Sequence, residues 1–571
     1  MTRFEDGRIG DKQLGVSSMF GADLFGRALK EQGAEVLFYM MGMGGPDSPA
    51  VRSMIEAGIK DVYIRHEGSA AMAAHAYARV AGKPAVVAAP VGPGTSNMIS
   101  GVANAYFDCA PMIVLAGGYL ISGPDSGFHE QDHVGMFKPV TKEAMRVESW
   151  KRIPEFIQRA YRIATHGRKG PVFLEIPTDL FFEAVDPNQI NWPKPLKATP
   201  KPKASEDELN TLVGFLRDAR RPVIAAGSGI IWSGAYEELR TFAETIGVPV
   251  ATTNQARGVL PESHELCQTG AKTKALNEAD LVIAIGTRSN WIWGHFQPPS
   301  FGLDFKMVCV NIDANEIDKG KEADLGIIAD AKTFLIQATE RLKGEKEICH
   351  RYTEWLQGLN GKKQKISEVA SGNYEKNKDN NPIHPLRLTK EIENILTPDT
   401  IFIGDGHECL EFARLNLKSQ KPHGFMTSGP NVCMGVGVPM AIGCKMAQPD
   451  RPVVVLMGDG GIGWQGMEYE TAIRHKLPFV GIVSNNGGFT ARSTAGGVGR
   501  EMGHVRYDKM VEAFGGYGEY VEKPEDIAPA LKRAMDSGLP ACVNVKVDPD
   551  VVGVKMMTLL KIKQSMEAAG Q

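Results

Sequence analysis

The feature of this 571-residue chain that most constrains its fold is a repeated alternation of short apolar runs with amphipathic stretches. The apolar runs include AVVAA, MIVLAG, LVIAIG, VVVLMG and CVNVKV. Strands of a parallel sheet are covered by helices on both faces, so they read as continuous apolar runs joined by crossover helices. We therefore predict the α/β class with doubly wound parallel sheets. A single core stops growing at roughly 250–300 residues, so several domains are needed.

Two segments interrupt this alternation and divide the chain. One is the Pro- and Lys-rich stretch 191–208, and the other is the charged, Gly- and Asn-rich run 343–382. We interpret both as linkers or irregular connections. The resulting domains are 18–190, 205–342 and 383–550, followed by a tail, 551–571, that could serve as a lid. The first and third domains end alike, in GRKGPVFLEIPTD and SGLPACVNVKVDPD, which indicates either two similar folds around a different one or a chance resemblance of sheet edges.

The composition excludes several classes of function. There are 64 basic and 67 acidic residues, a formal charge of −3, so the chain lacks the strong positive field of a nucleic-acid-binding protein. No run reaches the roughly 18 apolar residues of a membrane span, and the polar N-terminus lacks a secretory signal, so we expect a cytoplasmic protein without membrane partners. The scattered cysteines form no CxxC pair, which favours buried thiols over disulfides or a zinc site.

Two glycine loops follow apolar runs in the last third of the chain. VVVLMGDGGIG carries Asp459, and FVGIVSNNGGF carries Asn486. Both loops come at the carboxyl ends of predicted strands, where open α/β sheets bind ligands. Glycines let backbone N–H groups approach phosphate oxygens, and Asp459 with the Asn486 amide offers the oxygen ligands that Mg²⁺ prefers. A single GDGG loop is better explained as a turn at a strand end, so the second loop carries the prediction.

These two loops, 27 residues apart from Asp459 to Asn486, resemble the diphosphate-binding signature of thiamine diphosphate enzymes. The resemblance implies thiamine diphosphate and Mg²⁺ as cofactors. It assigns the metal to Asp459, Asn486 and the carbonyl of Gly488. It also places the glycines of the first loop on the diphosphate: Gly458, Gly460 and Gly461.

Glu67 lies in a second motif, RHEGSAAMAAHAYAR at 65–79, which is followed by VGPGTSN. An isolated glutamate at the start of an Ala-rich helix would only favour the helix dipole. The motif, however, resembles the pyrimidine-domain segment of the acetolactate synthase and oxalyl-CoA decarboxylase superfamily. That resemblance implies that Glu67 hydrogen-bonds N1′ of the cofactor's aminopyrimidine and thereby promotes removal of the C2 proton.

Two further stretches resemble parts of the family's pocket. SGPNVCMGVGVPMAIG resembles the segment that bends the cofactor. The carbonyl of Val432 would face the 4′-amino group and Met434 would form an apolar wedge, although a Met is also an ordinary core residue. GFHEQD resembles the loop over the reacting carbon, and it places Phe128 and His129 at the pocket. The imidazole would either shuttle protons or only hold the loop.

The remaining predictions concern the substrate and a nucleotide. Met41 and Thr490 complete, with Phe128, a predicted substrate pocket that lacks an obvious cation for a free carboxylate. Over almost the whole chain, the closest pattern in the family is that of oxalyl-CoA decarboxylase and 2-hydroxyacyl-CoA lyase. Those branches bind ADP, for which Arg159 and Asp313 are the implied counterparts. A solvated surface pair is the alternative.

Three departures from the pattern leave the substrate open. Thr490 stands where the family has Tyr, Glu408 lies where neutral groups usually approach the diphosphate, and the tail shows no evident CoA-gripping motif. We expect a thiamine diphosphate- and Mg²⁺-dependent carbon–carbon lyase or decarboxylase acting on a 2-hydroxyacyl-CoA or oxalyl-CoA-like thioester. The alternative is an acetolactate synthase-like carboligase or 2-oxoacid decarboxylase acting on free acids or aldehydes.

Glu67 and Asp459 fall in different predicted domains, so one site needs residues from both. In the family this site lies between subunits, which implies a homodimer or homotetramer. Outside this class, a nicotinamide-dependent dehydrogenase would use similar sheets, but VIAAGSGIIWSG lacks a full GxGxxG motif. A non-catalytic binding protein with the same fold would not need Glu67 together with both metal loops.

Overall fold

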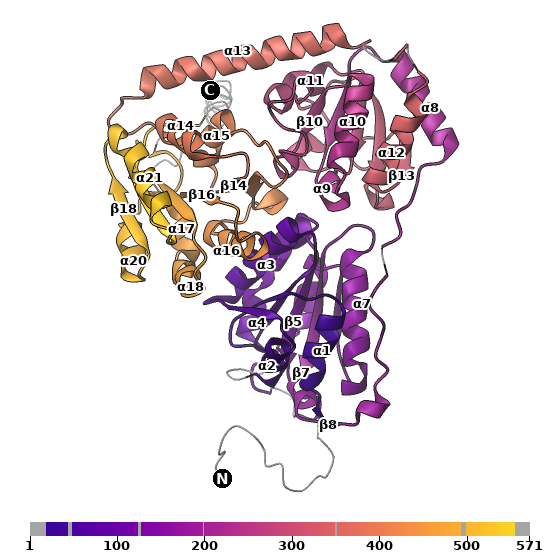
Figure 1. The fold of residues 1–571 in the computed structure, drawn as a ribbon, viewed down its shortest axis with the longest axis vertical. Helices are drawn as coiled ribbons and strands as arrows, with labels where there is room; N and C mark the ends of the chain where they lie inside the picture. Colours follow the sequence, from indigo (N-terminus) through magenta and orange to yellow (C-terminus); the bar gives the residue numbers. More distant parts are fainter. Residues whose placement is uncertain are drawn as a thin grey trace, which may run out of the picture.

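Three parallel sheets, each flanked by helices, form the three domains of the chain (Figure 1). The structure is a computed structural model, and it describes residues 19–43, 48–123, 127–197, 199–345, 347–348, 351–492 and 498–553. The predicted α/β class with doubly wound parallel sheets is confirmed. The tail beyond residue 553, predicted as a lid, and Cys349 lie outside the described residues.

The N-terminal sheet has six parallel strands in the order β3-β2-β4-β5-β7-β6. Its strands are β2 (Val36–Tyr39), β3 (Lys60–Tyr63), β4 (Ala85–Ala89), β5 (Met112–Gly118), β6 (Glu143–Arg146) and β7 (Pro171–Pro177). Its helices are α1 (Asp23–Glu31), α2 (Pro49–Glu56), α3 (Glu67–Ala81), α4 (Pro93–Asn97), α5 (Ile99–Phe107), α6 (His133–Phe137) and α7 (Ile153–Thr165). Every residue of β4, β5 and β7 is buried, which explains their apolar sequences. An antiparallel pair, β1 (Met19–Phe20) and β8 (Ala184–Val185), joins the two ends of the domain.

The central sheet has five parallel strands in the order β10-β9-β11-β12-β13. Its strands are β9 (Pro222–Ala226), β10 (Val250–Thr252), β11 (Leu281–Ile285), β12 (Lys306–Asn311) and β13 (Leu325–Ile328). Its helices are α8 (Glu206–Asp218), α9 (Gly229–Ser233), α10 (Tyr236–Ile246), α11 (Lys272–Glu278) and α12 (Ala331–Leu342). The sheet therefore differs from the first in strand number and order.

The C-terminal sheet has six parallel strands in the order β15-β14-β16-β17-β19-β18. Its strands are β14 (Ile401–Asp405), β15 (Phe425–Thr427), β16 (Val453–Gly458), β17 (Val480–Asn485), β18 (Tyr517–Val521) and β19 (Ala541–Lys546). Its helices are α14 (Pro385–Ile395), α15 (Glu408–Asn416), α16 (Gly437–Ala447), α17 (Asp459–Gln465), α18 (Glu468–Arg474), α20 (Tyr507–Ala513) and α21 (Ile527–Asp536). Counted from the first strand of each domain, this order is the same as in the N-terminal sheet, so the similar endings of these two domains reflect two similar folds.

The run 343–382 is not an irregular connection, which corrects the interpretation from sequence. Most of it forms α13 (Thr353–Asn377), which lies across the central and C-terminal domains at the top of Figure 1. Trp355 and Leu359 are its buried residues, so its sequence carries no apolar stripe of helical period. Lys363 donates hydrogen bonds to two backbone carbonyls of the central domain. Contacts with other domains, rather than a local pattern, stabilise this helix.

The N-terminal and C-terminal domains pack against each other through α3 and α16. A Cβ at Gly443 of α16 would lie 2.0 Å from the carbonyl oxygen of Ala73, so the two backbones come very close. The Ala-rich sequence of α3 permits this approach, and the two domains share one apolar core. The contact also brings the start of α3 beside the C-terminal domain, where Ser69 donates to Gln465 at 2.6 Å.

A buried polar network joins all three domains near this contact. Nε2 of His75 and Nη1 of Arg79 lie 2.9 and 2.7 Å from the same carboxylate oxygen of Asp108. Arg79 also donates to the carbonyl of Gln255 in the central domain, whose side chain accepts from Thr427 in the C-terminal domain at 3.0 Å. Burial alone would raise the pKa of Asp108, but Arg79 and His75 more than offset it and hold that pKa at about 2.

Candidate active site

A cavity of about 100 Å³ lies at the carboxyl ends of β14, β16 and β17 in the C-terminal domain. Asp459 begins α17 directly after β16, and Asn486 follows β17. Both residues line the cavity, as do Met434 and Thr490. The positive end of the α17 dipole adds to its suitability for an anion.

The carboxylate of Asp459 is incompletely satisfied in this cavity. Asp459 is 3% exposed, and its Oδ1 accepts a hydrogen bond from the N–H of Gly460 at 2.9 Å. Its buried Oδ2 has no hydrogen-bond partner among the described residues. Burial raises the pKa of Asp459 to about 6, against the opposing effect of nearby backbone N–H groups. A buried carboxylate oxygen without a partner is costly, and a cation would satisfy it.

Asn486 is held so that its amide oxygen is available to a ligand. Its Nδ2 donates to the carbonyl of Thr490 at 3.0 Å. Within the described ranges, no group of three or more His, Cys, Asp and Glu side chains could hold a metal. A cation here would therefore depend on Asp459 together with amide and carbonyl oxygens, such as those of Asn486 and Gly488. That donor set fits Mg²⁺, which prefers oxygen ligands.

Two of the loop glycines leave no room for a side chain. A Cβ at Gly460 would lie 2.6 Å from the Phe489 ring, and a Cβ at Gly488 would lie 2.2 Å from the carbonyl oxygen of Arg500. These glycines line the cavity together with Gly458 and Gly461. The backbone is therefore left bare toward the cavity, as the approach of a diphosphate requires.

Two buried charges that support these loops were not predicted from the sequence. The fully buried side chain of Arg500 donates to the carbonyls of Thr490 and Asn486 at 2.9 and 3.0 Å. Asp405 accepts two backbone N–H groups from the 435–437 turn at 3.1 and 2.9 Å, and burial raises its pKa to about 6. The run IFIGDG, which repeats the pattern of the first metal loop, was an available signal for Asp405. Arg500 has no comparable signal, because it supports the loops through backbone carbonyls.

Four predicted site residues have strained backbones. Met41, His129, Val432 and Thr490 have φ angles of 56°, 59°, 53° and 56°. The described residues include ten non-glycine positions with positive φ, so the predicted site accounts for four of them. This conformation is costly for a β-branched residue such as Val432, and such strain concentrates at functional sites. Met434 is 38% exposed, so it is not an ordinary core residue.

Glu67 is buried at the start of α3, 5% exposed. Asn97 of α4 donates to its Oε2 at 3.1 Å, and Gly94 leaves space beside its Oε1, where a Cβ would lie at 2.8 Å. None of the described N-terminal residues lines the Asp459 cavity. Within one chain, Glu67 and Asp459 therefore do not line the same cavity.

The predicted loop over the reacting carbon is exposed in this chain. The rings of Phe128 and His129 stack with centroids 3.7 Å apart, and Phe128 is 81% exposed. A Cβ at Gly92 would lie 2.5 Å from the Cβ of His129, so the loop rests on the turn before α4. An open cavity of about 850 Å³ lies beside it, lined among others by His129, Arg146 and Glu175.

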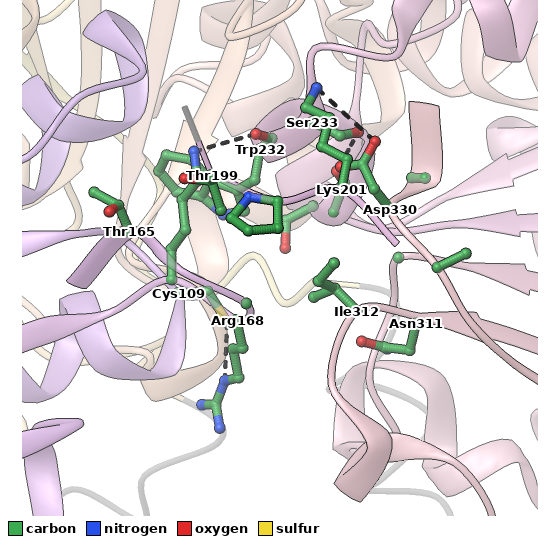
Figure 2. Close-up of a pocket in the computed structure, with 18 of the residues that line it drawn as sticks. Cys109, Thr165, Arg168, Thr199, Lys201, Trp232, Ser233, Asn311, Ile312 and Asp330 are labelled. Atoms are coloured by element: carbon green, nitrogen blue, oxygen red, sulfur yellow. Dashed lines mark hydrogen bonds and ion pairs between the residues drawn. The ribbon is translucent and has the colours of Figure 1, made fainter. Parts of the chain in front are cut away.

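A second candidate site lies between the N-terminal and central domains, at the carboxyl ends of β9, β11, β12 and β13. It is a cavity of about 340 Å³, lined by cations from both domains, and Figure 2 shows Arg168 and Lys201 among them, with Lys201 paired to Asp330. Arg159 and Asp313 do not line it. Instead, Arg159 pairs with Glu143, and Asp313 caps the short turn that follows β12.

Comparison with known proteins identifies this arrangement. Three family models match: the thiamine pyrophosphate enzyme N-terminal TPP-binding domain over residues 19–136, the central domain over 209–338 and the C-terminal TPP-binding domain over 406–545. The chain belongs to the thiamine pyrophosphate enzyme family. Its relatives include the 2-hydroxyacyl-CoA lyase of Arabidopsis thaliana, 29% identical over 560 residues that cover 93% of this chain and 96% of that protein. The acetolactate synthase large subunit IlvG of Mycobacterium tuberculosis is 32% identical over 548 residues, covering 94% and 97%.

Membership of the thiamine pyrophosphate enzyme family confirms the predicted superfamily, its organic cofactor, thiamine diphosphate, and the enzyme class of a thiamine diphosphate-dependent carbon–carbon lyase. The two kinds of relative carry different names, so the substrate is not decided by similarity. Within the described part of the chain, no helix is both long and apolar enough to cross a membrane.

Proposed function

We propose that this enzyme is a thiamine diphosphate- and Mg²⁺-dependent lyase or decarboxylase acting on a 2-hydroxyacyl-CoA or oxalyl-CoA-like thioester. The choice of a CoA thioester is carried by a cationic cavity of about 360 Å³ between α13, the central domain and the end of α15. Lys363, Arg414 and Lys418 line it. The Nε of Arg414 is buried and has no hydrogen-bond partner in the part of the chain that the structure describes.

Helix α15 connects this cationic cavity to the cofactor cavity. Glu408 at its start lines the cofactor cavity, and Arg414 near its end lines the cationic cavity. The helix has nine residues and so spans about 13 Å, a distance that an extended pantetheine arm can cover. Burial lowers the pKa of Arg414, with Arg257 adding to the effect, so an anionic group beside it would be stabilising. CoA phosphates would supply such a group and hold a small acyl chain from a distance.

The residues around the cofactor divide into two groups. Asp459, Asn486 and the Gly488 carbonyl would hold Mg²⁺ against the diphosphate. When bound, thiamine diphosphate supplies a carbon nucleophile and accepts the electrons released on cleavage. Glu67 would exchange a proton with ring nitrogen N1′. His129 would lie at the reacting carbon, where it either moves a proton or holds the loop.

We also propose a homodimer or homotetramer with sites between chains. The described residues that line the Asp459 cavity come from the C-terminal domain alone, which supports a site that Glu67 reaches from a second copy. Large apolar side chains on α17 and next to it are exposed: Trp464 by 62% and Met467 by 51%. Such side chains at a protein surface favour an interface.

A substrate panel tests the thioester. We expect kcat/KM for lactyl-, 2-hydroxyisobutyryl- or oxalyl-CoA to exceed that for pyruvate and benzoylformate by about 100-fold or more. Arg414→Gln should raise KM for the thioester and leave its kcat nearly unchanged, since it removes binding energy remote from the reaction. Lys376→Gln on α13 is the matched control, because Lys376 is exposed and lies outside the cavity. A preference for free 2-oxoacids would overturn the thioester proposal.

An acetolactate synthase-like carboligase or 2-oxoacid decarboxylase is the second candidate. It is supported by the 32% identity to the acetolactate synthase of M. tuberculosis. It predicts that purified protein forms acetolactate or releases CO₂ from pyruvate at a rate that no thioester in the panel matches.

A nucleotide of the ADP type is a separate proposal for the cavity of Figure 2. The cavity lies where parallel sheets bind nucleotides, and four cations line it, Arg168, Lys169, Lys201 and Arg288, together with one carboxylate, Asp330. Mass spectrometry of the supernatant from heat-denatured protein tests it. Recovery of about one ADP per chain would support it, and protein that neither carries ADP nor gains thermal stability from added ADP would refute it.

A further inference from the structure

His133 is a fully buried histidine that has no role in the proposed reaction. It is the first residue of α6, and both of its ring nitrogens are engaged. Nδ1 lies 2.7 Å from Oε2 of Glu175, and Nε2 lies 3.1 Å from the backbone nitrogen of Gly92. The side chains of His133 and Glu175 are 0% and 1% exposed. Buried polar groups need hydrogen-bond partners, so these bonds are required for both side chains to be buried.

The partners determine which nitrogen carries the proton. The N–H of Gly92 can only donate, so Nε2 of His133 must present its lone pair. Nδ1 therefore carries the proton and donates to Glu175. The charge of Glu175 is balanced by Arg146, whose Nη1 lies 2.8 Å from Oε1. This arrangement fixes the ring in one tautomer and one orientation.

The backbone group that His133 holds belongs to the helix that contacts Glu67. Gly92 is the N-cap of α4, with φ 77° and ψ −125°, a conformation open to glycine. α4 then presents Gly94 and Asn97 to the two carboxylate oxygens of Glu67. A shift of the Gly92 backbone would therefore move both contacts of Glu67 together.

We propose that His133 is a positioning residue for Glu67. The buried chain from Glu175 through His133 to the Gly92 N–H holds α4 where Asn97 and Gly94 enclose the Glu67 carboxylate. The proposal rests on the proposed role of Glu67 as the partner of the cofactor ring. His133 is linked to Glu67 through Gly92 and α4, so it should act on the rate of cofactor activation and not on cofactor binding.

The test is the exchange of the C2 proton of bound thiamine diphosphate in deuterated water, measured by NMR on the holoenzyme. His133→Leu should slow exchange about tenfold or more, because small misplacements of a reacting group are costly, and should leave cofactor content unchanged. His133→Gln should restore most of the rate, since its amide oxygen can take the position of Nε2 and accept from the N–H of Gly92. His133→Asn should stay slow although it keeps the Glu175 bond, because its shorter side chain does not reach Gly92.

The matched control is His75→Leu, which removes an equally buried histidine whose ring is hydrogen-bonded to Asp108 and Asn104 and not to a residue of α4. It should lower thermal stability and leave the exchange rate at the wild-type value. Wild-type exchange in His133→Asn, or equal rates in His133→Gln and His133→Leu, would overturn the proposal.

Glu67→Gln separates the proposed role of Glu67 from the proposed role of His133. Unchanged exchange in Glu67→Gln refutes the role of Glu67, whereas slow exchange in Glu67→Gln with normal exchange in His133→Asn refutes the role of His133 alone. If His133→Leu does not fold, the Asn and Gln variants decide the question.

Discussion

The N-terminal and C-terminal domains have the same strand order but different chemistry at the same place in the sheet. In each, the third strand, β4 or β16, leads into a glycine loop and a short helix, α4 or α17. In the C-terminal domain this loop carries Asp459, whose buried Oδ2 lacks a hydrogen-bond partner among the described residues. In the N-terminal domain the loop, Gly92–Gly94, carries no charge and lies against Glu67. The shared sheet sets where a loop stands, and the side chains of the loop set what it can bind.

Both domains match thiamine pyrophosphate-binding models, and we propose that the two loops serve two parts of one cofactor. The proposed division is that the loop of the C-terminal domain holds the diphosphate and that of the N-terminal domain supports activation of the ring. Variants in one domain should therefore change binding, and variants in the other should change rate.

The largest effect is expected from the C-terminal loop. Asp459→Ala should weaken thiamine diphosphate binding in the presence of Mg²⁺ by roughly 1,000-fold, because the diphosphate loses its bridging ion. Calorimetric titration of the apoenzyme measures it. Asp450→Ala, an exposed aspartate of the same domain, is the control and should bind normally. Wild-type affinity in Asp459→Ala would contradict the metal assignment.

In the N-terminal domain, Glu67→Gln should change rate and not binding. We expect bound cofactor at wild-type content and C2 proton exchange slower by about 100-fold or more, since an amide can contact N1′ but cannot serve as its acid–base partner. Glu56→Gln, at an exposed position on α2, should exchange normally. A Glu67→Gln protein that loses cofactor would place Glu67 in binding, against the division between the domains.

The network that joins the domains should affect stability alone. Asp108→Asn leaves the charge of Arg79 buried without its counter-ion, which should lower the free energy of unfolding by about 3 kcal/mol at pH 7. Because the folded pKa of Asp108 is depressed to about 2, its carboxylate stabilises the fold above the unfolded pKa of about 3.9, and this contribution is lost as the pH falls through about 2. Urea unfolding of the wild type and of Asp108→Asn at pH 7 and at pH 3 measures the loss of stability and its pH dependence. The exposed Asp526→Asn is the control. An equal loss of stability at both pH values would contradict this explanation.

The smallest effect is expected at the exposed loop of the N-terminal domain. His129→Ala should lower kcat about tenfold with the best substrate of the panel and leave cofactor affinity unchanged, because the loop is predicted to face the reacting carbon and not the diphosphate. Steady-state kinetics and cofactor titration together measure it. If thermal stability changes and kcat does not, His129 only holds the loop.

The interior strands could be predicted from the sequence, and most of the edge strands could not. β4, β11 and β16 are buried along nearly their whole length and appear as apolar runs. Edge strands such as β13 and β18 are exposed or half-exposed at all but one position, so burial constrains their sequences less. α13 was also missed, because contacts with other domains stabilise it and its sequence has no apolar stripe.

The site divides in a similar way between residues with a motif and residues without one. Glu67, Asp459 and Asn486 stand in local motifs that resemble ligand-binding segments of the family, so their positions could be proposed from the chain alone. Arg500 and His133 act through backbone groups that are distant in sequence, and only the folded structure brings those groups to them.

We propose that Glu67 of one chain meets the Asp459 cavity of another chain. This proposal is tested by co-expressing Glu67→Gln and Asp459→Ala chains with different tags and isolating the mixed oligomer, a dimer in the simplest case. One of its two shared sites then contains both original residues, and the other contains neither. We predict about one tightly bound thiamine diphosphate per pair of chains, with C2 proton exchange at the wild-type rate. If each chain instead formed its own site, the mixed oligomer would bind the same amount of cofactor in the Glu67→Gln chain and exchange slowly, and a site shared between chains would be excluded.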